Sequence, residues 1–140
     1  MDADQLLLEH LDWHRIQQLK YRYCYCIDER RCNEFVDLFT DDARIEYATR
    51  EPYHGRDEIR AFIETHVMEA DRMAHTALNP ILDIDGDEAS GQWYGIVFIS
   101  NDADGDVSFG HGKYHETYRR EEDGWKFASL RTESRFSTDI

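Results

Sequence analysis

The period at which apolar residues recur changes near the middle of this sequence. Up to about residue 67 most apolar residues lie three or four positions apart, whereas from about residue 72 they fall in strand-like runs. The first spacing places apolar side chains on one face of a helix, and the second is typical of strands. Helices followed by consecutive antiparallel strands indicate an α+β domain.

Three helices are predicted in the first half. The first spans about residues 5–29, the second begins with Asn33 as its N-cap and ends before a break at 40–42, and the third follows Gly55. Each has an apolar stripe at helical spacing. The stripes contain Ile16, Leu19, Tyr23 and Cys26; Phe35, Val36 and Phe39; and Ile59, Phe62, Ile63 and Val67.

Strand-like runs are predicted at 44–48, 72–84, 90–101, 107–119 and 125–136. Asp-Gly pairs at 85–86, 104–105 and 123–124 separate the last four runs at hairpin spacing. The segment 92–99 is apolar on both faces. We therefore expect one face to contact the helices and the other to contact another sheet or a second subunit.

Length and charge restrict the organisation and the partners of the chain. Its 140 residues, without a linker or a repeat, predict a single domain over residues 1–140. The formal net charge of −14 disfavours nucleic acid and anionic membrane surfaces. The expected partner is therefore a small molecule that is uncharged or weakly anionic.

The N-terminal residues and the cysteines predict a cytoplasmic location. Residues 1–5 contain no basic region, the leucines at 6–8 are too few for a signal sequence, and no run is long enough for a membrane helix. Cys24, Cys26 and Cys32 lie close together in one helical region and are odd in number. Reduced thiols are therefore expected rather than disulfides.

Asp28 and His75 are the strongest candidates for chemistry. Asp28 lies at the end of the first predicted helix, where the helix dipole disfavours a carboxylate, and such a local conflict suggests a function. His75 shares a strand face with Met73 and Ala77, so a hydrogen-bonded core histidine is the alternative. If a sheet that curls around the helices brings the pair together, the carboxylate can hold one ring nitrogen and leave the other to take a proton.

Tyrosines and one arginine are further candidates near such a pocket. Tyr47 could point into it from the first strand, and Tyr23 precedes Asp28 by little more than one helical turn. Each could equally be plain core, although a buried hydroxyl needs a partner. Arg135 could balance a carbonyl or carboxylate of a ligand or form a surface ion pair.

No metal site is expected. His10 and His14 lack a third ligand, and His111 and His115 on a strand are about 13 Å apart. The acidic segment 102–106 lacks the glycine position and the final glutamate of an EF-hand loop, so we interpret it as a turn.

The order of several motifs resembles SnoaL-like members of the nuclear transport factor 2-like superfamily over nearly the whole chain. Residues 16–20, Tyr23 and 26–28 resemble the first helix of bile-acid dehydratases, and 44–47 resembles the first strand of scytalone dehydratase. His75 and the later segments complete the pattern; these are 83–86, 91–94, 118–120 and 123–127.

This resemblance implies a cone-shaped α+β barrel in which three N-terminal helices pack inside a strongly curved, mainly antiparallel sheet. It implies that Asp28 and His75 form a catalytic dyad and that Tyr47 assists carbonyl polarisation. Tyr23 and Arg135 match functional positions of bile-acid dehydratases, and Tyr114 matches a pocket-lining position. Ile99 and Val97 stand where relatives have a second pocket histidine or an acid.

The resulting hypothesis is a cofactor-independent, dehydratase-like lyase that acts on a hydrophobic cyclic hydroxy-carbonyl, polyketide-like or steroid-like molecule. An isomerase or cyclase could use the same dyad. The alternative is a non-catalytic ligand-binding or assembly subunit, such as the small subunits of ring-hydroxylating dioxygenases. A homo-oligomer, trimer or dimer, is expected in either case.

Overall fold

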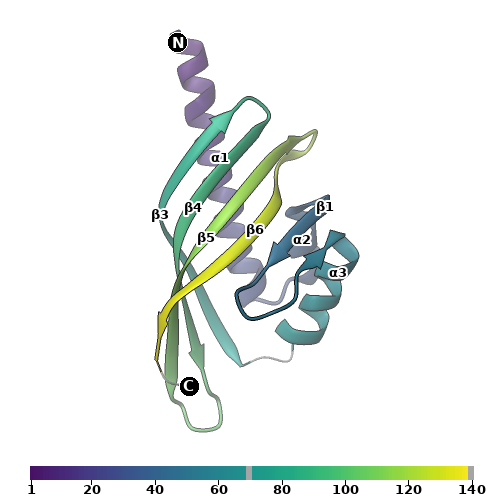
Figure 1. The fold of residues 1–140 in the computed structure, drawn as a ribbon, viewed down its shortest axis with the longest axis vertical. Helices are drawn as coiled ribbons and strands as arrows, with labels where there is room; N and C mark the ends of the chain where they lie inside the picture. Colours follow the sequence, from purple (N-terminus) through teal and green to yellow (C-terminus); the bar gives the residue numbers. More distant parts are fainter. Residues whose placement is uncertain (69–70, 139–140) are drawn as a thin grey trace.

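The computed structural model describes residues 1–68 and 71–138. Helices occupy the first half of the chain, as the apolar spacing predicts (Figure 1). They are α1 (Ala3–Asp28), α2 (Cys32–Asp37) and α3 (Gly55–Phe62), which continues into the π-helix η1 (Ile63–Val67). Asp2 and Gln5 form a reciprocal capping box at the start of α1, which satisfies backbone N–H groups that have no helical partner.

Six strands form one open sheet in the order β2-β1-β6-β5-β4-β3. All neighbours are antiparallel except β1 and β6, which are parallel. The strands are β1 (Phe39–Glu46), β2 (Tyr53–His54), β3 (Arg72–Asp85), β4 (Glu88–Ser100), β5 (Val107–Glu121) and β6 (Gly124–Ser137). The four long strands confirm the predicted runs.

The turns between the long strands also follow the prediction. Gly86, Gly105 and Gly124 have φ values of +64°, +76° and +124°. These values lie in a region that side chains with a Cβ disfavour, so glycine suits each of the three turns.

The segment after α2 differs from the prediction. Asn33 lies inside α2 and accepts a hydrogen bond from Arg60, while Arg31 is the N-cap residue. Phe39 and residues 40–42 belong to β1 rather than to a helix and a break. The tertiary reason is that Phe39 pairs with Phe127 of β6 and that the Phe127 N–H donates to the Leu38 carbonyl at 2.8 Å.

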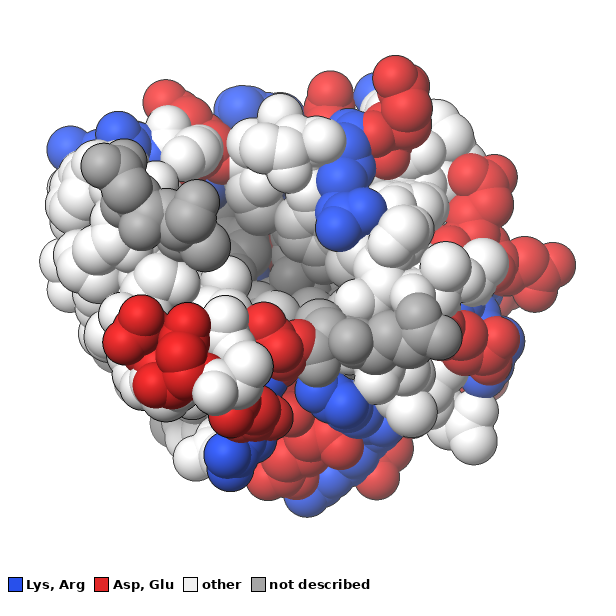
Figure 2. All heavy atoms as spheres, turned by 90° about the horizontal axis from the view of Figure 1, so that it is seen from below, with Lys and Arg blue, Asp and Glu red and all other residues white. Residues whose placement is uncertain are grey.

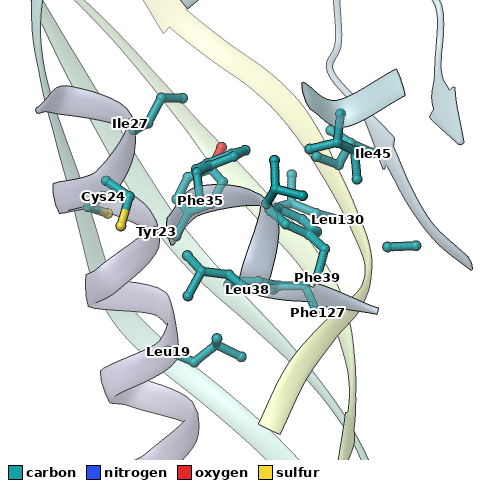
Figure 3. Close-up of a cluster of buried hydrophobic side chains, with 14 of the residues drawn as sticks. Leu19, Tyr23, Cys24, Ile27, Phe35, Leu38, Phe39, Ile45, Phe127 and Leu130 are labelled. Atoms are coloured by element: carbon teal, nitrogen blue, oxygen red, sulfur yellow. The ribbon is translucent and has the colours of Figure 1, made fainter. Parts of the chain in front are cut away.

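The sheet curves around α1, and the buried core lies between them (Figure 3). From α1 this core receives the predicted stripe, in which Ile16 and Tyr23 have no exposed surface. Phe39 of β1 packs between Phe35 of α2 and Phe127 of β6, with tilted rings and 5.2 Å between centroids in each pair. The resulting architecture is the α+β cone that the resemblance implies, with an open sheet instead of a closed barrel.

The N-terminal end of α1 extends beyond the strands (Figure 1). Leu6, Leu7 and Leu8 are exposed there. None of the helices in the described part of the chain is both long enough and apolar enough to cross a membrane.

Candidate active site

A pocket of about 380 Å³ opens between the C-terminal end of α1, the α3–η1 segment and the inner face of the long strands. Figure 2, which views the molecule from below relative to Figure 1, shows it hollowed at this end. Apolar side chains form much of the lining; they include Ile27, Phe62, Val67, Met73 and Val97. A second hollow, of about 540 Å³, lies among residues such as Arg44, Ser90 and Thr117, and no predicted site residue lines it.

Asp28 and His75 meet at the edge of this pocket. The Asp28 carboxylate accepts two hydrogen bonds from His75: Oδ2 from the backbone N–H at 2.8 Å and Oδ1 from ring Nδ1 at 2.6 Å. The side chains of Asp28 and His75 are 21% and 8% exposed, respectively. His75 itself lines the pocket. No hydrogen bond to its Nε2 is found within residues 1–68 and 71–138, so this nitrogen is available to a ligand.

Local structure explains why the two residues meet. Asp28 is the last residue of α1, and β3 alternation places His75 on the inner face with Met73 and Ala77. A carboxylate at a helix C-terminus is disfavoured by the dipole, but two donors from β3 compensate it here. Because the Nδ1–H bonds the carboxylate, the neutral ring keeps its lone pair on Nε2.

Three tyrosines form a hydroxyl cluster on the pocket wall. The hydroxyl oxygens of Tyr23 and Tyr47 are 2.8 Å apart, and the Tyr114 ring meets the Tyr23 ring edge-on with 5.9 Å between centroids. All three line the pocket, and Tyr23 meets the His75 ring edge-on at 6.3 Å between centroids. Burial raises the pKa of each phenol. The hydroxyls therefore stay protonated and can donate hydrogen bonds to a ligand oxygen.

A glycine brings Tyr114 against the sheet. A Cβ atom placed on Gly95 of β4 would lie 2.4 Å from Cε2 of Tyr114, well inside van der Waals contact. Gly95 pairs with Gly112 of β5, and both line the pocket. Gly95 thus leaves room for the Tyr114 ring, and Gly112 leaves room for the backbone carbonyl of Glu133 on β6.

Beneath the tyrosines lies a buried ion pair that the sequence analysis did not identify. Lys20 Nζ donates to Glu116 Oε2 at 2.5 Å, and neither side chain has any exposed surface. Burial lowers the pKa of Lys20, whereas the charge of Glu116 opposes that shift. The position of Lys20, one residue after Leu19 of the apolar stripe, was the available signal, but a lysine is seldom fully buried.

Arg135 lies away from the pocket. It is exposed on β6, with its guanidinium carbon 5.2 Å from the centre of the Tyr94 ring, and it does not line the cavity. The basic residues that line the cavity are Arg50, Lys113, His66, His75 and His111. In the described ranges 1–68 and 71–138, no group of three His, Cys, Asp or Glu side chains is arranged to hold a metal.

Comparison with known proteins establishes the family. The sequence profile of the SnoaL-like domain matches residues 9–131, which is most of the chain. This protein belongs to the SnoaL-like domain family. A search of curated protein sequences finds no significant match. The family assignment confirms the resemblance drawn from the order of the motifs.

Solved structures share the fold of this SnoaL-like domain. A candidate scytalone dehydratase from Novosphingobium aromaticivorans is 21% identical, with a TM-score of 0.87 over 99% of this chain and 92% of its own. Hexachlorocyclohexane dehydrochlorinase LinA-type3 from Novosphingobium barchaimii is 19% identical, with a TM-score of 0.82 over 100% and 94%. A candidate aromatic ring hydroxylase from Novosphingobium aromaticivorans is 26% identical, with a TM-score of 0.83 over 91% and 92%.

Proposed function

We propose that this SnoaL-like domain is a cofactor-independent lyase that removes water from a hydrophobic cyclic hydroxy-carbonyl compound. The observation that carries the proposal is the 2.6 Å hydrogen bond between Asp28 Oδ1 and His75 Nδ1. His75 lines the pocket, and its other ring nitrogen has no hydrogen-bond partner among the residues that the structure describes. A histidine held in this way can act as a general base through its second ring nitrogen.

In the proposed reaction, His75 Nε2 takes the proton from the carbon next to the substrate carbonyl. The electron pair of that C–H bond forms the enolate, and Asp28 stabilises the imidazolium. When the enolate re-forms the carbonyl, the C–O bond to the neighbouring hydroxyl breaks. The imidazolium returns the proton to that hydroxyl, which leaves as water and yields a conjugated carbonyl product.

Tyr47 is proposed to donate a hydrogen bond to the developing enolate oxygen. Its hydroxyl is joined to that of Tyr23 at 2.8 Å, so the donor is held in position before the reaction begins. Preorganised donors in a site with little water stabilise developing negative charge. Tyr23 and Tyr114 complete the substrate-binding wall.

The pocket favours a small, largely apolar substrate. Its volume of about 380 Å³ lies within the range of ordinary small-molecule sites, and polyketide-like or steroid-like ring systems are the proposed class. Isomerisation or cyclisation would begin with the same proton transfer. The relatives named as a dehydratase and a dehydrochlorinase support an elimination.

A non-catalytic assembly subunit is the second candidate. The outer face of the sheet exposes Leu78, Phe98 and Phe136, and one structural relative is named as a candidate ring hydroxylase. Exposed apolar surface of this kind is typical of an interaction site. We propose that this face supports self-association as a dimer or trimer. The proposed location of the protein is the cytoplasm.

The proposed function is tested by α-proton exchange, which requires no knowledge of the leaving group. The protein is incubated in deuterated water with a panel of cyclic ketones and cyclic β-hydroxy ketones, and deuterium incorporation and enone absorbance are recorded. We expect exchange in several ketones and enone formation in a subset of the hydroxy ketones. Absence of exchange across the panel, combined with co-purification with a larger iron-dependent subunit, would favour the assembly role.

A further inference from the structure

The Lys20–Glu116 ion pair lies directly behind the hydroxyl cluster of the pocket. Lys20 Nζ is 3.2 Å from the centre of the Tyr114 ring and 4.2 Å from the centre of the Tyr23 ring. Both rings carry hydroxyls that belong to the pocket wall. The ammonium is therefore in contact with two of the three phenol rings, although Lys20 does not itself line the pocket.

Both carboxylate oxygens of Glu116 accept hydrogen bonds. Its Oε2 accepts from Lys20, and its Oε1 accepts from the Tyr118 hydroxyl at 2.6 Å. The Tyr118 oxygen in turn accepts from Trp93 Nε1 at 2.9 Å. Four buried side chains from α1, β4 and β5 thus form one hydrogen-bonded chain, which fixes the ammonium in one place.

Stability alone gives a weak reason for such a pair. Desolvation of two charges opposes much of their attraction, and apolar residues of similar volume often replace a buried pair without loss of stability. The orientation of this pair does have an electrostatic consequence in the pocket. Lys20 Nζ lies over the rings of Tyr23 and Tyr114, whereas Glu116 is hydrogen-bonded to Tyr118, outside the hydroxyl cluster. The positive end of the pair therefore faces the cluster.

The position of the Lys20 ammonium opposes the effect of the Glu116 charge on the pocket. Burial first, and the charge of Glu116 in addition, raise the pKa values of Tyr47 and Tyr114, so a lone carboxylate would disfavour any anion in the pocket. A cation over an aromatic face is attracted by the ring and withdraws electron density from it. A phenol under this influence is a stronger hydrogen-bond donor to an oxyanion.

We propose that Lys20 is a positioning residue, which, held by Glu116, orients Tyr23 and Tyr114 and biases the pocket toward ligands with a negatively charged oxygen. This inference rests on the proposed function, because an enolate is such a ligand. It adds that the preference for a negatively charged ligand comes from a buried ion pair behind the pocket wall. The ligand class is an apolar ring bearing an oxyanion or an acidic hydroxyl.

The test measures binding of para-nitrophenol, which is small, aromatic and coloured differently as phenol and as phenolate. Dissociation constants are determined at one pH below and one pH above the pKa of the probe, for wild type and for the double variant Lys20→Met/Glu116→Gln. We expect the phenolate to bind about tenfold more weakly in the variant. This loss corresponds to a rise of about one unit in the pKa of the bound probe. Binding of the neutral phenol should change less than about twofold, within the scatter of ordinary context effects.

A matched control neutralises one cation and one anion far from the tyrosines. Arg119 and Asp42 form a surface ion pair at 3.1 Å, and Arg119→Gln/Asp42→Asn should leave both dissociation constants unchanged. A purely structural role for Lys20 would weaken phenol and phenolate binding to the same extent. An unchanged phenolate-to-phenol ratio in a folded double variant would overturn the proposal.

A measurement on the wild-type protein covers the case in which the double variant does not fold. The chain's lysines are Lys20, Lys113 and Lys126, and isotopic labelling allows each side-chain nitrogen to be followed by NMR. Bound para-nitrophenolate should shift the Lys20 resonance, whereas bound nitrobenzene should not; equal shifts would contradict the proposal. Because neither probe reacts, this result is independent of proton exchange by His75, so the proposed function can fail separately.

Discussion

Helix α1 carries two buried or half-buried carboxylates, Asp12 and Asp28, which have different hydrogen-bond partners. Asp12, in its first half, accepts from Arg120 at 2.8 and 2.6 Å and from Trp125 Nε1 at 3.1 Å. Asp28, at its last turn, accepts two hydrogen bonds from a single residue, His75. One carboxylate is paired with a permanent cation, and the other with a ring that can gain or lose a proton.

The partner decides what each carboxylate can do. A bidentate guanidinium holds a carboxylate in its charged form and has no proton to exchange near neutral pH. An imidazole bound at one nitrogen still presents a base at the other. The Asp12 cluster therefore fastens α1 to β5 and β6, whereas the Asp28 contact holds His75 at the pocket by one ring nitrogen.

Replacement of His75, the proposed base, should have the largest effect. His75→Ala is expected to lower the rate of α-proton exchange by roughly 10²–10⁴-fold, the usual scale of general acid–base catalysis. The rate is measured by deuterium incorporation into the best ketone of the panel. His115→Ala is the control, because His115 bonds Glu133 at the surface and does not line the pocket. Equal rates in wild type and His75→Ala would exclude the dyad.

Asp28→Asn should have the next largest effect, about 10²-fold on the exchange rate. If the introduced side-chain amide presents its NH₂ group to Nδ1 of His75, the ring proton moves to Nε2 and blocks the base. Circular dichroism and thermal melting should show that the fold is retained. Exchange at the wild-type rate in a folded variant would mean that Asp28 serves only to join α1 to β3.

Asp12→Asn should change stability without changing exchange. Loss of the charged hydrogen bonds to Arg120 is expected to lower the free energy of unfolding by about 2 kcal/mol, measured by urea denaturation. Arg120 is partly exposed, which keeps the effect moderate. If Asp12→Asn instead slowed exchange as strongly as Asp28→Asn, the contrast between the two carboxylates would be wrong.

The Asp12 contribution should also depend on pH. Hydrogen bonds from Arg120, with support from Trp125, hold the pKa of Asp12 below its ordinary value of 3.8 despite burial. Between the two pKa values the unfolded chain binds more protons than the folded protein, so stability rises with pH in this window. The contribution is complete above the ordinary value and disappears as the pH falls through the folded-state pKa. The stability difference between wild type and Asp12→Asn should therefore shrink in acid.

Of the three pocket variants, Tyr47→Phe should have the smallest effect on the exchange rate, a loss of about tenfold, because roughly one hydrogen bond to the enolate is removed. The control variant is Tyr53→Phe. The Tyr53 ring packs on Phe62 with 4.9 Å between centroids, and Tyr53 does not line the pocket. A larger loss in Tyr53→Phe than in Tyr47→Phe would contradict the assignment of the donor.

Local patterns were sufficient for most of the fold. The stripe of α1, the four long strands and their Asp-Gly turns depend on side-chain period and on glycine conformation, which neighbouring residues determine. The start of β1 at Phe39 was missed, because its parallel pairing with β6 joins residues far apart in the sequence. Local spacing carries no information about such a partner.

The sequence by itself determined the three helical stripes, the four long strands and the turns between them, and it marked Asp28 and His75 as unusual where they stand. Only the tertiary structure decided that these two side chains meet, that Arg135 lies away from the pocket, and that Lys20 is buried against Tyr114. The physical reason is that the contacts of a charged or polar side chain depend on the curvature and register of strands that arrive later in the chain. A helix stripe shows which residues are buried, whereas the sheet that closes over it determines which of them share a site.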